Sequence, residues 1–141
     1  MDRTVELLRA MGEESRLRIL LLLEQAGELS VADLSQTLEL AQPKVSRHLS
    51  RLRLAGWVRD RRWRGFSLYR VVLQPGDIHR EYLLNLTEHL REDNTAASDL
   101  ERLGALRRSS RQTGLREAEQ EDNEAPVPDI DPTQPPSAGL A

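Results

Sequence analysis

Two stretches of helical periodicity, followed at once by a change to period two, constrain this chain most strongly. Apolar side chains recur at helical spacing over residues 31–38 and again over 42–55, with only three residues between them. Residues 57–62 and 66–72 then alternate as strands do, around a turn in which Gly65 can supply a positive φ. This order predicts a helix-turn-helix with a β-hairpin directly behind it, the shape called a wing.

Local signals support both helices of the predicted helix-turn-helix. Ser30 and Asp33 form a capping-box-like pair before the first helix. Pro43 suits the first turn of the second helix, where its missing N–H costs nothing, and Gly56 is a typical helix end. The stripe that this second helix is expected to bury consists of Val45, Leu49 and Leu52.

The rest of the chain predicts more helix and then a tail. Further helices are expected over residues 3–11, 13–26 and 77–93. The fold class is therefore mainly α-helical with a small β-hairpin. The expected domains are a winged helix-turn-helix unit over 1–95, a helical extension over 96–109, and a disordered, acidic, proline-rich tail over 110–141.

Composition excludes several classes of protein. The chain has no cysteine, so disulfides, thiolate metal sites and cysteine nucleophiles are excluded. Its longest apolar run, residues 19–23, is far shorter than the roughly 20 residues that cross a bilayer, and no secretory signal is visible. Neither a phosphate-cradling glycine loop nor a recognisable nucleophile context is present. We expect a cytoplasmic protein that is not an enzyme, needs no cofactor and binds no membrane.

Charge is strongly segregated along the chain. Residues 41–70 hold nine basic side chains and a single acidic one, Asp60, whereas the segment after Arg116 holds seven acidic side chains and no basic one. A local basic block is typical of a protein whose partner has a phosphate backbone. We expect that partner to be double-stranded DNA, and a merely solvated helix face is the alternative.

An ordered series of motifs runs through residues 3–93. It includes Glu28-Leu29-Ser30-Val31-Ala32-Asp33-Leu34 and Gln42-Pro43-Lys44-Val45-Ser46-Arg47-His48-Leu49, and it continues to Tyr69-Arg70. This series resembles the ArsR/SmtB family of winged-helix metalloregulatory repressors, and its second string is similar to the arsenic-repressor branch. The resemblance implies a dimeric winged helix-turn-helix protein that represses transcription.

Two departures from that family matter. The arsenic branch carries cysteines at the positions of Ser30, Ala32 and usually Ser35, and those thiolates bind arsenite or soft metals. Serine and alanine cannot replace a thiolate for a soft ion, so we expect no metal and no arsenite sensing there. Ala41 stands where the family usually has a helix-capping serine, a loss of about 1 kcal/mol.

Burial of the apolar stripe points a polar set of side chains outward from the second helix. Gln42 can pair with adenine and Arg47 with guanine in a major groove, while Lys44 and Arg51 suit phosphates. His48 lies at the edge of the buried stripe, where packing is favoured over base recognition. The predicted DNA-binding residues of this helix are Gln42, Lys44, Ser46, Arg47, Ser50 and Arg51.

The predicted hairpin tip is basic and aromatic. Arg61, Arg62 and Arg64 are expected to contact the minor groove or the adjacent backbone, where negative potential attracts arginine. Trp63 at the tip can stack or act as a wedge. The other aromatic residues of this region are expected in the core: Trp57, Phe66 and Tyr69.

An apolar row at strict i+4 spacing predicts self-association. This row, in the helix over 77–93, is long for a helix at the edge of so small a core. A two-fold dimer is therefore favoured, with packing of the row on its own domain as the alternative. The predicted interface residues are Leu7, Leu8, Ile78, Tyr82, Leu86 and Leu90.

Four side chains of this helix are similar to the family's inter-subunit zinc site, which has the pattern D-x-H and H-x-x-E. They are Asp77, His79, His89 and Glu92, and such nitrogen and oxygen ligands suit zinc. His79 and His89 are ten residues apart, however, whereas the family pattern has eleven. One residue rotates a helical side chain by about 100°, so we predict no metal site, with zinc binding as the alternative.

These observations predict a homodimeric repressor that binds a palindromic operator and is released by an unidentified small-molecule effector without thiol chemistry. The alternatives are a winged-helix module that docks on an acidic protein, a zinc-responsive repressor, a repressor with no effector at all, and a regulatory fragment paired with an enzyme. The acidic tail supplies a further hypothesis, in which it competes with DNA for the basic face. Deleting the residues after about 110 would then strengthen DNA binding.

Overall fold

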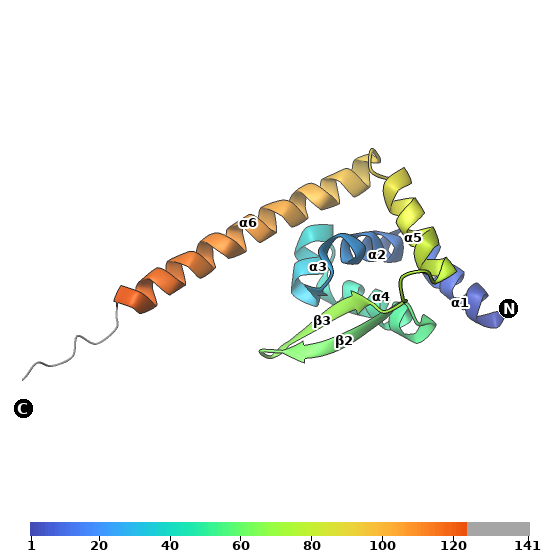
Figure 1. Cartoon of the computed structure of the whole chain (residues 1–141), viewed down its shortest axis with the longest axis horizontal. Helices are drawn as coiled ribbons and strands as arrows, with labels where there is room; N and C mark the ends of the chain where they lie inside the picture. Colours follow the sequence, from blue (N-terminus) through green and yellow to red (C-terminus); the bar gives the residue numbers. More distant parts are fainter. Residues whose placement is uncertain (124–141) are drawn as a thin grey trace, which may run out of the picture. The chain divides into compact units, whose positions relative to one another are not determined.

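The computed structural model describes the backbone of residues 1–123 and the side chains of residues 1–113. The chain divides into two units, residues 1–109 and residues 110–141. The elements in chain order are α1 (Asp2–Met11), α2 (Glu14–Ala26), β1 (Leu29–Ser30), α3 (Val31–Leu38), α4 (Gln42–Ala55), β2 (Val58–Trp63), β3 (Phe66–Val71), α5 (Ile78–His89) and α6 (Asn94–Asn123) (Figure 1).

Local hydrogen bonds explain where the helices begin. Glu13 accepts from the backbone N–H of Arg16 (3.0 Å) before α2, and Ser30 accepts from the backbone N–H of Asp33 (3.1 Å) before α3. Such bonds satisfy N–H groups that a first helical turn leaves without partners. The start of α4 differs, because Ala41 occupies the capping position and its side chain makes no such bond.

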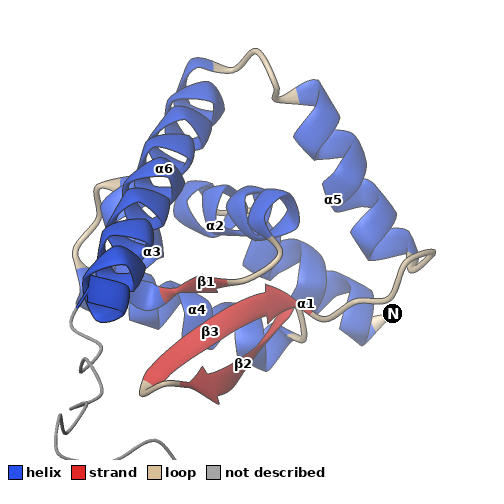
Figure 2. Ribbon diagram, turned by 60° about the vertical axis from the view of Figure 1, so that its left-hand side comes forward, coloured by secondary structure: helices blue, strands red, loops and turns tan. Residues whose placement is uncertain are grey.

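The strands form one antiparallel sheet in the order β1-β3-β2 (Figure 2). β2 and β3 form the predicted hairpin, and Trp63 lies opposite Phe66 at its tip. Leu29 of β1 pairs with Tyr69 of β3, which adds a third strand that the sequence analysis did not predict. A strand of two residues is too short to show an alternating pattern, so only its pairing partner reveals it.

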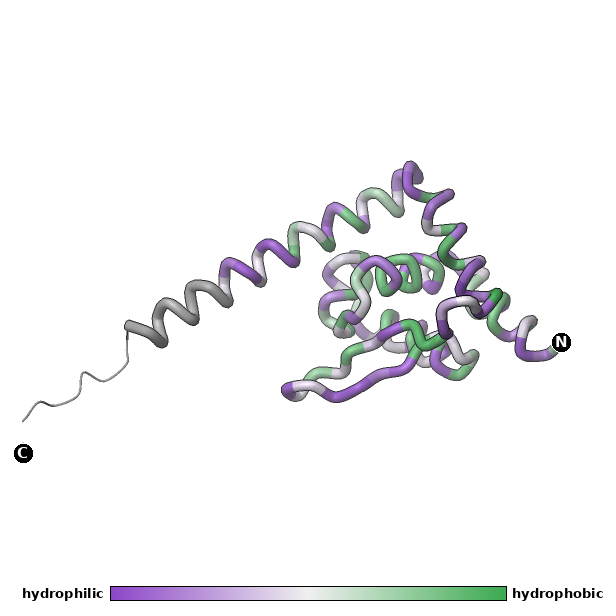
Figure 3. The backbone as a smooth tube through the Cα atoms, viewed as in Figure 1, coloured by the Kyte–Doolittle hydropathy of each residue, from purple (hydrophilic) through white to green (hydrophobic). Residues whose placement is uncertain are grey.

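The core of residues 1–109 is built around α2. Its apolar run, residues 19–23, is entirely buried. Trp57 is also completely buried, and its indole Nε1 donates to the backbone oxygen of Leu7 (2.8 Å), which ties α1 to the segment between α4 and β2. Figure 3 shows the contrast in hydropathy between α2, which is largely apolar, and β2, which is largely polar.

α5 turns the first two residues of its i+4 row toward the solvent and the last two toward the core. Leu83, which lies outside that row, is completely buried, whereas Ile78 and Tyr82 are exposed. A strict i+4 row rotates about 40° at each step and leaves the face on which it began. The inward face instead follows mixed spacing of three and four residues, through His79, Leu83, Leu86 and Leu90.

The first turns of α6 are anchored to the helices of the core. Leu103 is buried, and the buried carboxylate of Asp99 accepts hydrogen bonds from Arg18 of α2 (2.8 Å) and from Arg102 (2.6 Å). Arg102 also donates to the backbone oxygen of Thr37 (2.6 Å), in the last turn of α3. These arginines connect α6 to the first helix of the helix-turn-helix.

The end of α6 differs from the prediction. The sequence analysis expects disorder from residue 110, but the backbone of residues 110–123 continues as helix. Few helix breakers occur before Pro126, so local helix propensity is compatible with this extension. Residues 124–141, with the proline-rich part of the expected tail, lie outside the described residues. Although α6 is 30 residues long, neither it nor any other described helix is apolar enough to span a membrane.

Candidate nucleic-acid interface

α4 divides its side chains between the core and the solvent. Val45, Leu49 and Leu52 are completely buried, as the stripe predicts. The opposite side of the helix forms a surface that we call the α4 face. It consists of six exposed residues, Gln42, Lys44, Ser46, Arg47, Ser50 and Arg51. All of them are predicted DNA-binding residues, and one helix therefore brings them together.

The turn before α4 is fixed by hydrogen bonds. Ser35 Oγ donates to the backbone oxygen of Leu40 (2.5 Å). In return, the backbone N–H of Leu40 donates to the backbone oxygen of Ser35 (3.1 Å). Glu39 ends α3 in the left-handed conformation, with a φ of 55°. These bonds set the direction in which α4 leaves α3, and so the direction in which the α4 face points.

The cations of the α4 face are not neutralised within the protein. Among the described side chains, no carboxylate lies within ion-pair distance of Lys44, Arg47 or Arg51. A cation without an internal partner does not have to break an ion pair before it meets a phosphate. The α4 face is therefore ready to bind an anionic surface.

A groove of about 420 Å³ between α1 and α4 places two more arginines beside the α4 face. Arg9 and Arg16 line this groove together with Arg51. Arg16 is held in place because its Nε donates to the backbone oxygen of Ala10 (2.5 Å). Sequence reasoning missed both residues, because they lie outside the basic block at 41–70 and only helix packing brings them to Arg51.

His48 lies between the α4 face and the core, in agreement with the packing role favoured by its position. Its ring is mostly buried, and Nδ1 is 3.7 Å from the carboxylate of Glu13. Burial lowers the pKa of His48, and although Glu13 opposes this effect, the nearby cations add to it. The neutral form of this ring is therefore favoured over the charged form.

Arg61 of β2 is engaged inside the protein. Its Nε and Nη2 donate to the two carboxylate oxygens of Glu28, at 2.6 and 2.7 Å. This bidentate bond lowers the pKa of Glu28 and raises that of Arg61. Glu28 directly precedes β1, so the pair fastens the wing to the opposite edge of the sheet. Glu28 is 33 residues from Arg61, so no local pattern predicts this pair.

The other two arginines of the wing tip also have internal contacts. Arg62 donates to the backbone oxygen of Gly65 (3.3 Å) and lies 3.5 Å from Ser67 Oγ. The guanidinium of Arg64 lies over the ring of Trp63, 4.6 Å from its centroid. Both arginines remain exposed to solvent, so the tip keeps its positive charge while its side chains are held in place.

One aromatic residue of the wing is not where the sequence analysis expects it. Trp57 is buried and Tyr69 packs against the core, but the prediction for Phe66 is wrong, because 57% of its surface is exposed. Phe66 follows the turn directly, so it sits at the end of the hairpin that is farthest from α4. It shares that place with Trp63, which is 47% exposed.

The residues predicted for a dimer interface fall into three groups. Leu8, Ile78 and Tyr82 are large, exposed apolar side chains on α1 and α5. Leu86 and Leu90 are half-buried and pack against the core of their own protomer. The expectation for Leu7 is corrected, because this side chain is completely buried within the protomer and cannot contact a partner.

Two of the four residues that are similar to a zinc site lie together. Asp77 accepts from the backbone N–H of His79 (2.9 Å) and lies 2.8 Å from its Nδ1, contacts that lower the pKa of Asp77 to about 2. The other ring nitrogen of His79 is 3.1 Å from Thr4 Oγ1. The described part of one chain contains no metal-binding group of three or more side chains, so His89 and Glu92 do not complete this pair.

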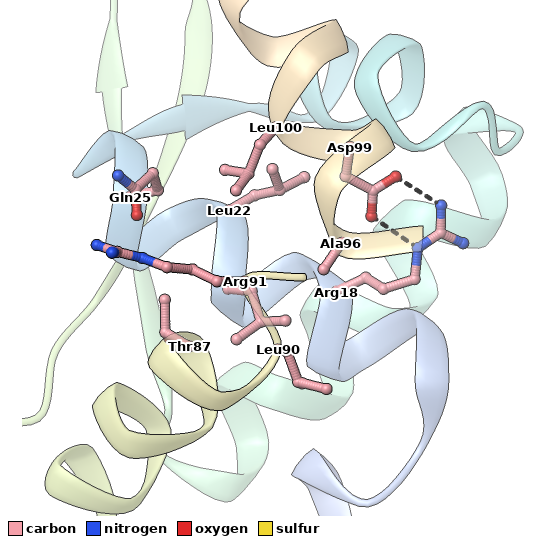
Figure 4. A pocket seen from close by; sticks show the side chains of 10 residues that line it. Arg18, Leu22, Gln25, Thr87, Leu90, Arg91, Ala96, Asp99 and Leu100 are labelled. Carbon is pink, nitrogen blue, oxygen red and sulfur yellow. Dashed lines mark hydrogen bonds and ion pairs between the residues drawn. The ribbon is translucent and has the colours of Figure 1, made fainter. Parts of the chain in front are cut away.

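A small crevice lies between α2, α5 and α6 (Figure 4). Leu22, Leu90 and Leu100 line it, and an ion pair between Arg18 and Asp99 lies at one side. Its volume of about 20 Å³ is enough for about one water molecule. A small-molecule effector would therefore enter this crevice only if the three helices moved apart.

The arrangement defines a winged helix-turn-helix, with α3 and α4 as the helix-turn-helix and β2–β3 as the wing. Residues 13–60 match the family model described as bacterial regulatory protein, arsR family. An arsenic resistance transcriptional regulator of Pseudomonas putida is 44% identical over 63 residues, which cover 45% of this chain and 49% of that protein. This chain belongs to the arsR family of bacterial regulatory proteins.

Solved structures agree with this assignment. Reduced HlyU from Vibrio cholerae is 36% identical with a TM-score of 0.52, over 64% of this chain and 86% of that one. It is named a transcriptional activator. A homodimeric winged helix-turn-helix DNA-binding domain from Mycobacterium bovis is 27% identical with a TM-score of 0.54, over 66% of this chain and 86% of that one. The chain spans about half the length of the three arsenic-resistance regulators it matches, from 49% to 57%.

The positions that carry thiolates in the arsenic branch have structural roles in this chain. Ser30 caps α3, and the hydroxyl of Ser35 closes the turn before α4. Ala32 is exposed on α3 and has no polar group. These hydroxyls support the helix-turn-helix itself, and none of the three side chains is a ligand for a soft ion.

Proposed function

We propose that this chain is a sequence-specific DNA-binding regulator of transcription, which acts as a homodimeric repressor on a palindromic operator. The α4 face is the observation that carries this proposal, since unpaired cations project from a helix whose opposite side is buried. A helix of this size fits the major groove, where its N-terminal residues meet base edges. The similarity to named transcriptional regulators, one called a repressor and another an activator, supports regulation of transcription.

Four side chains of the α4 face have a proposed role. Arg47 contacts guanine and Gln42 contacts adenine, because these pairs match in donors and acceptors. Lys44 and Arg51 bind phosphates, which hold the helix in position but carry little sequence information. The complete proposed set is Gln42, Lys44, Ser46, Arg47, Ser50 and Arg51 on α4, with Arg61, Arg62 and Arg64 on the wing.

A two-fold dimer explains why the operator would be palindromic. Leu8, Ile78 and Tyr82 expose large apolar surfaces on α1 and α5, and a second copy that covers them would remove these surfaces from water. Leu86 and Leu90 would contribute their exposed edges. Two copies related in this way insert two α4 helices into successive major grooves, about 34–36 Å apart.

The proposed release of the operator uses a small-molecule effector that acts on this chain without thiol chemistry, since the chain has no cysteine. Such an effector must bind the DNA-free conformation more tightly than the DNA-bound one, because equal affinity shifts no equilibrium.

Selection of bound duplexes from a random DNA pool tests the proposed function. We expect an imperfect palindrome to be enriched, and we expect binding to weaken steeply as salt is raised, because arginine–phosphate contacts release counterions. The selection is repeated with zinc and with a chelator, which tests the zinc alternative. A protein that is monomeric and binds no duplex at low ionic strength would refute the proposal.

Two substitutions then separate base recognition from phosphate binding. Arg47→Ala should weaken binding by about 1–3 kcal/mol and relax the preference at one base pair, while Arg62→Ala should weaken all sequences about equally. Arg91→Ala, which removes an exposed arginine after α5, is the matched control and should change neither. If Arg47→Ala leaves both affinity and preference intact, the role of the α4 face is wrong.

A further inference from the structure

The wing ends in a pair of aromatic side chains that the protein leaves uncovered. Trp63 and Phe66 are directly opposite each other in the register of β2 and β3, so both side chains project from the same side of the hairpin. Arg64 and Gly65 between them have φ angles of 47° and 80°. Two positive values in sequence are typical of the tightest hairpin turn, which places the two rings side by side at the tip.

These two rings differ from the other aromatic side chains of the described wing region. Trp57 is completely buried and Tyr69 is partly covered by the core, whereas Trp63 and Phe66 are 47% and 57% exposed. The strand register explains why they are neighbours, but it does not explain why so much apolar surface faces water at the end of a protruding element. A partner that covers them would explain it.

The side of the hairpin that carries the aromatic pair also carries cations. Side chains alternate between the two sides of a strand, so this side includes the opposed pair Arg59 and Arg70, together with Arg61. The other side includes Val58, which is buried against the core. The aromatic pair therefore ends a row of arginines, and Arg64 lies over the ring of Trp63 itself.

We propose that the aromatic pair Trp63 and Phe66 is a wedge that enters the minor groove of duplex DNA and opens a base step there. Apolar wedges flanked by arginines partly unstack base pairs, because phosphates attract the cations while the rings replace lost stacking. Continuity with the α4 face favours DNA as the occupant, since β2 begins three residues after α4 ends. This inference rests on the proposed function and adds a second contact that deforms the operator.

The wedge adds sequence preference without base-specific hydrogen bonds. Opening a step costs least where stacking is weak, as at pyrimidine–purine steps such as TA, and costs most in stiff A-tracts. Operators with a flexible step beneath the wing should therefore bind more tightly than operators with an A-tract there, even when the sites under α4 are identical.

The double substitution Trp63→Thr with Phe66→Thr tests the wedge in the full-length chain. Threonine favours β-strands and is stable opposite another threonine, so the hairpin is retained while the aromatic surface is removed. Leu54→Thr is the matched control, because it removes an exposed leucine in the last turn of α4, outside the wing. Circular dichroism and thermal unfolding confirm that each variant is folded.

Three measurements on the selected operator distinguish a wedge from a structural pair. They are affinity, the DNA bend measured by circular permutation, and the affinity ratio between operators with TA and with an A-tract at the minor-groove position protected by the wing. We expect the double variant to bind about tenfold more weakly, to bend DNA less and to lose the preference for TA. The Leu54→Thr control should match the natural chain in all three.

Tryptophan fluorescence gives an independent readout. Trp57 is buried, so acrylamide quenches mainly Trp63 in the free protein. Binding of the operator should protect this fluorescence from quenching, and a chain with Phe66→Thr alone should be protected less. Unchanged quenching in the complex would contradict the wedge.

The outcomes separate this inference from the proposed function. If the natural chain binds and bends its operator and the double variant behaves in the same way, the wedge is wrong and the α4 assignment stands. If the natural chain binds no duplex, the proposed function fails first. If the double variant changes the oligomeric state in the absence of DNA, the aromatic pair contacts protein, and the wedge is equally refuted.

Discussion

The α4 face and the wing are both rich in cations, yet the protein treats these cations in opposite ways. Lys44, Arg47 and Arg51 have no carboxylate partner among the described residues. On the wing, Arg61 is bound to Glu28 through two hydrogen bonds. The first region is a set of free charges on a helix that the core holds rigid. The second is a hairpin whose charges also hold its own shape.

This difference teaches that a basic segment in a sequence does not indicate what each cation does. A free arginine can contribute its full charge to a phosphate contact, whereas a paired one must first lose its internal partner. Exposed ion pairs are weak, so the pairing on the wing reduces that contribution without abolishing it. The two regions should therefore respond differently to the same kind of substitution.

The largest expected difference concerns stability. Leu49→Ala removes a completely buried side chain beneath the α4 face and should lower the free energy of unfolding by about 2–5 kcal/mol. Phe66→Ala at the wing tip should lower it by about 1 kcal/mol or less, because only a cross-strand pair is lost. Urea unfolding of both variants measures the contrast, and equal losses would mean that the wing is as much part of the core as α4.

A smaller effect is expected at the start of α4. Ala41→Ser introduces a hydroxyl at an N-cap position with extended backbone angles (φ −60°, ψ 139°), and should stabilise the fold by about 1 kcal/mol. Ser30→Ala is the reciprocal test, since it removes the existing cap of α3 and should cost about the same. Thermal unfolding measures both changes. No gain from Ala41→Ser would show that water already satisfies the first turn of α4.

Glu28→Gln tests the difference between free and paired cations directly. It keeps the size of the side chain but removes its charge, so Arg61 should become available to DNA. We expect affinity to rise by a factor of about three to ten, and the dependence of log K on log salt to steepen by about 0.9 for each Arg61, or about 1.8 for the dimer. Adding Arg61→Gln should reverse the gain. If Glu28→Gln instead lowers the affinity for DNA, the ion pair serves to position the wing, and it does not withhold Arg61 from the phosphates.

The smallest expected effect is on the pH dependence of stability and involves His48. Because its pKa is lowered in the folded state, the unfolded chain binds a proton more readily. The neutral ring of His48 therefore contributes free energy of unfolding that is fully present above the unfolded pKa of about 6.5. This contribution is lost as the pH falls through the folded pKa, because the unfolded chain takes up the proton first. His48→Gln should flatten the decline of the unfolding free energy below about pH 6.5. A decline identical to that of the natural chain would remove His48 as its cause.

Much of the candidate site could be predicted from local patterns. The burial of Val45, Leu49 and Leu52 follows from helical periodicity, and their burial alone settles which side chains of α4 are exposed. The hairpin follows from alternation and from Gly65, whose φ is 80°. In each case the deciding interaction is between residues close in sequence, so the pattern contains the information.

Other features could not be predicted, because they depend on contacts between distant residues. Phe66 is apolar as a core residue would be, but the strand register places it on the side of the hairpin opposite Val58, which is buried. The i+4 row of α5 predicts one common face, whereas packing leaves its first two residues exposed and places its last two beside Leu83, against the core. The position of Leu7 on a short amphipathic helix predicts an interface residue. In the structure its side chain is buried, and its backbone oxygen accepts a hydrogen bond from Trp57, which is 50 residues away.

By itself the sequence determined the helix-turn-helix, the hairpin and the position of the basic block, because periodicity and turn residues act over a few neighbours. Only the tertiary structure decided which cations are free, which aromatic side chains are exposed and where a third strand pairs. Those properties arise when segments far apart in the chain come into contact. Glu28 forms an ion pair with Arg61, and Leu29 pairs with Tyr69 in the sheet. No local pattern contains the geometry of such an encounter.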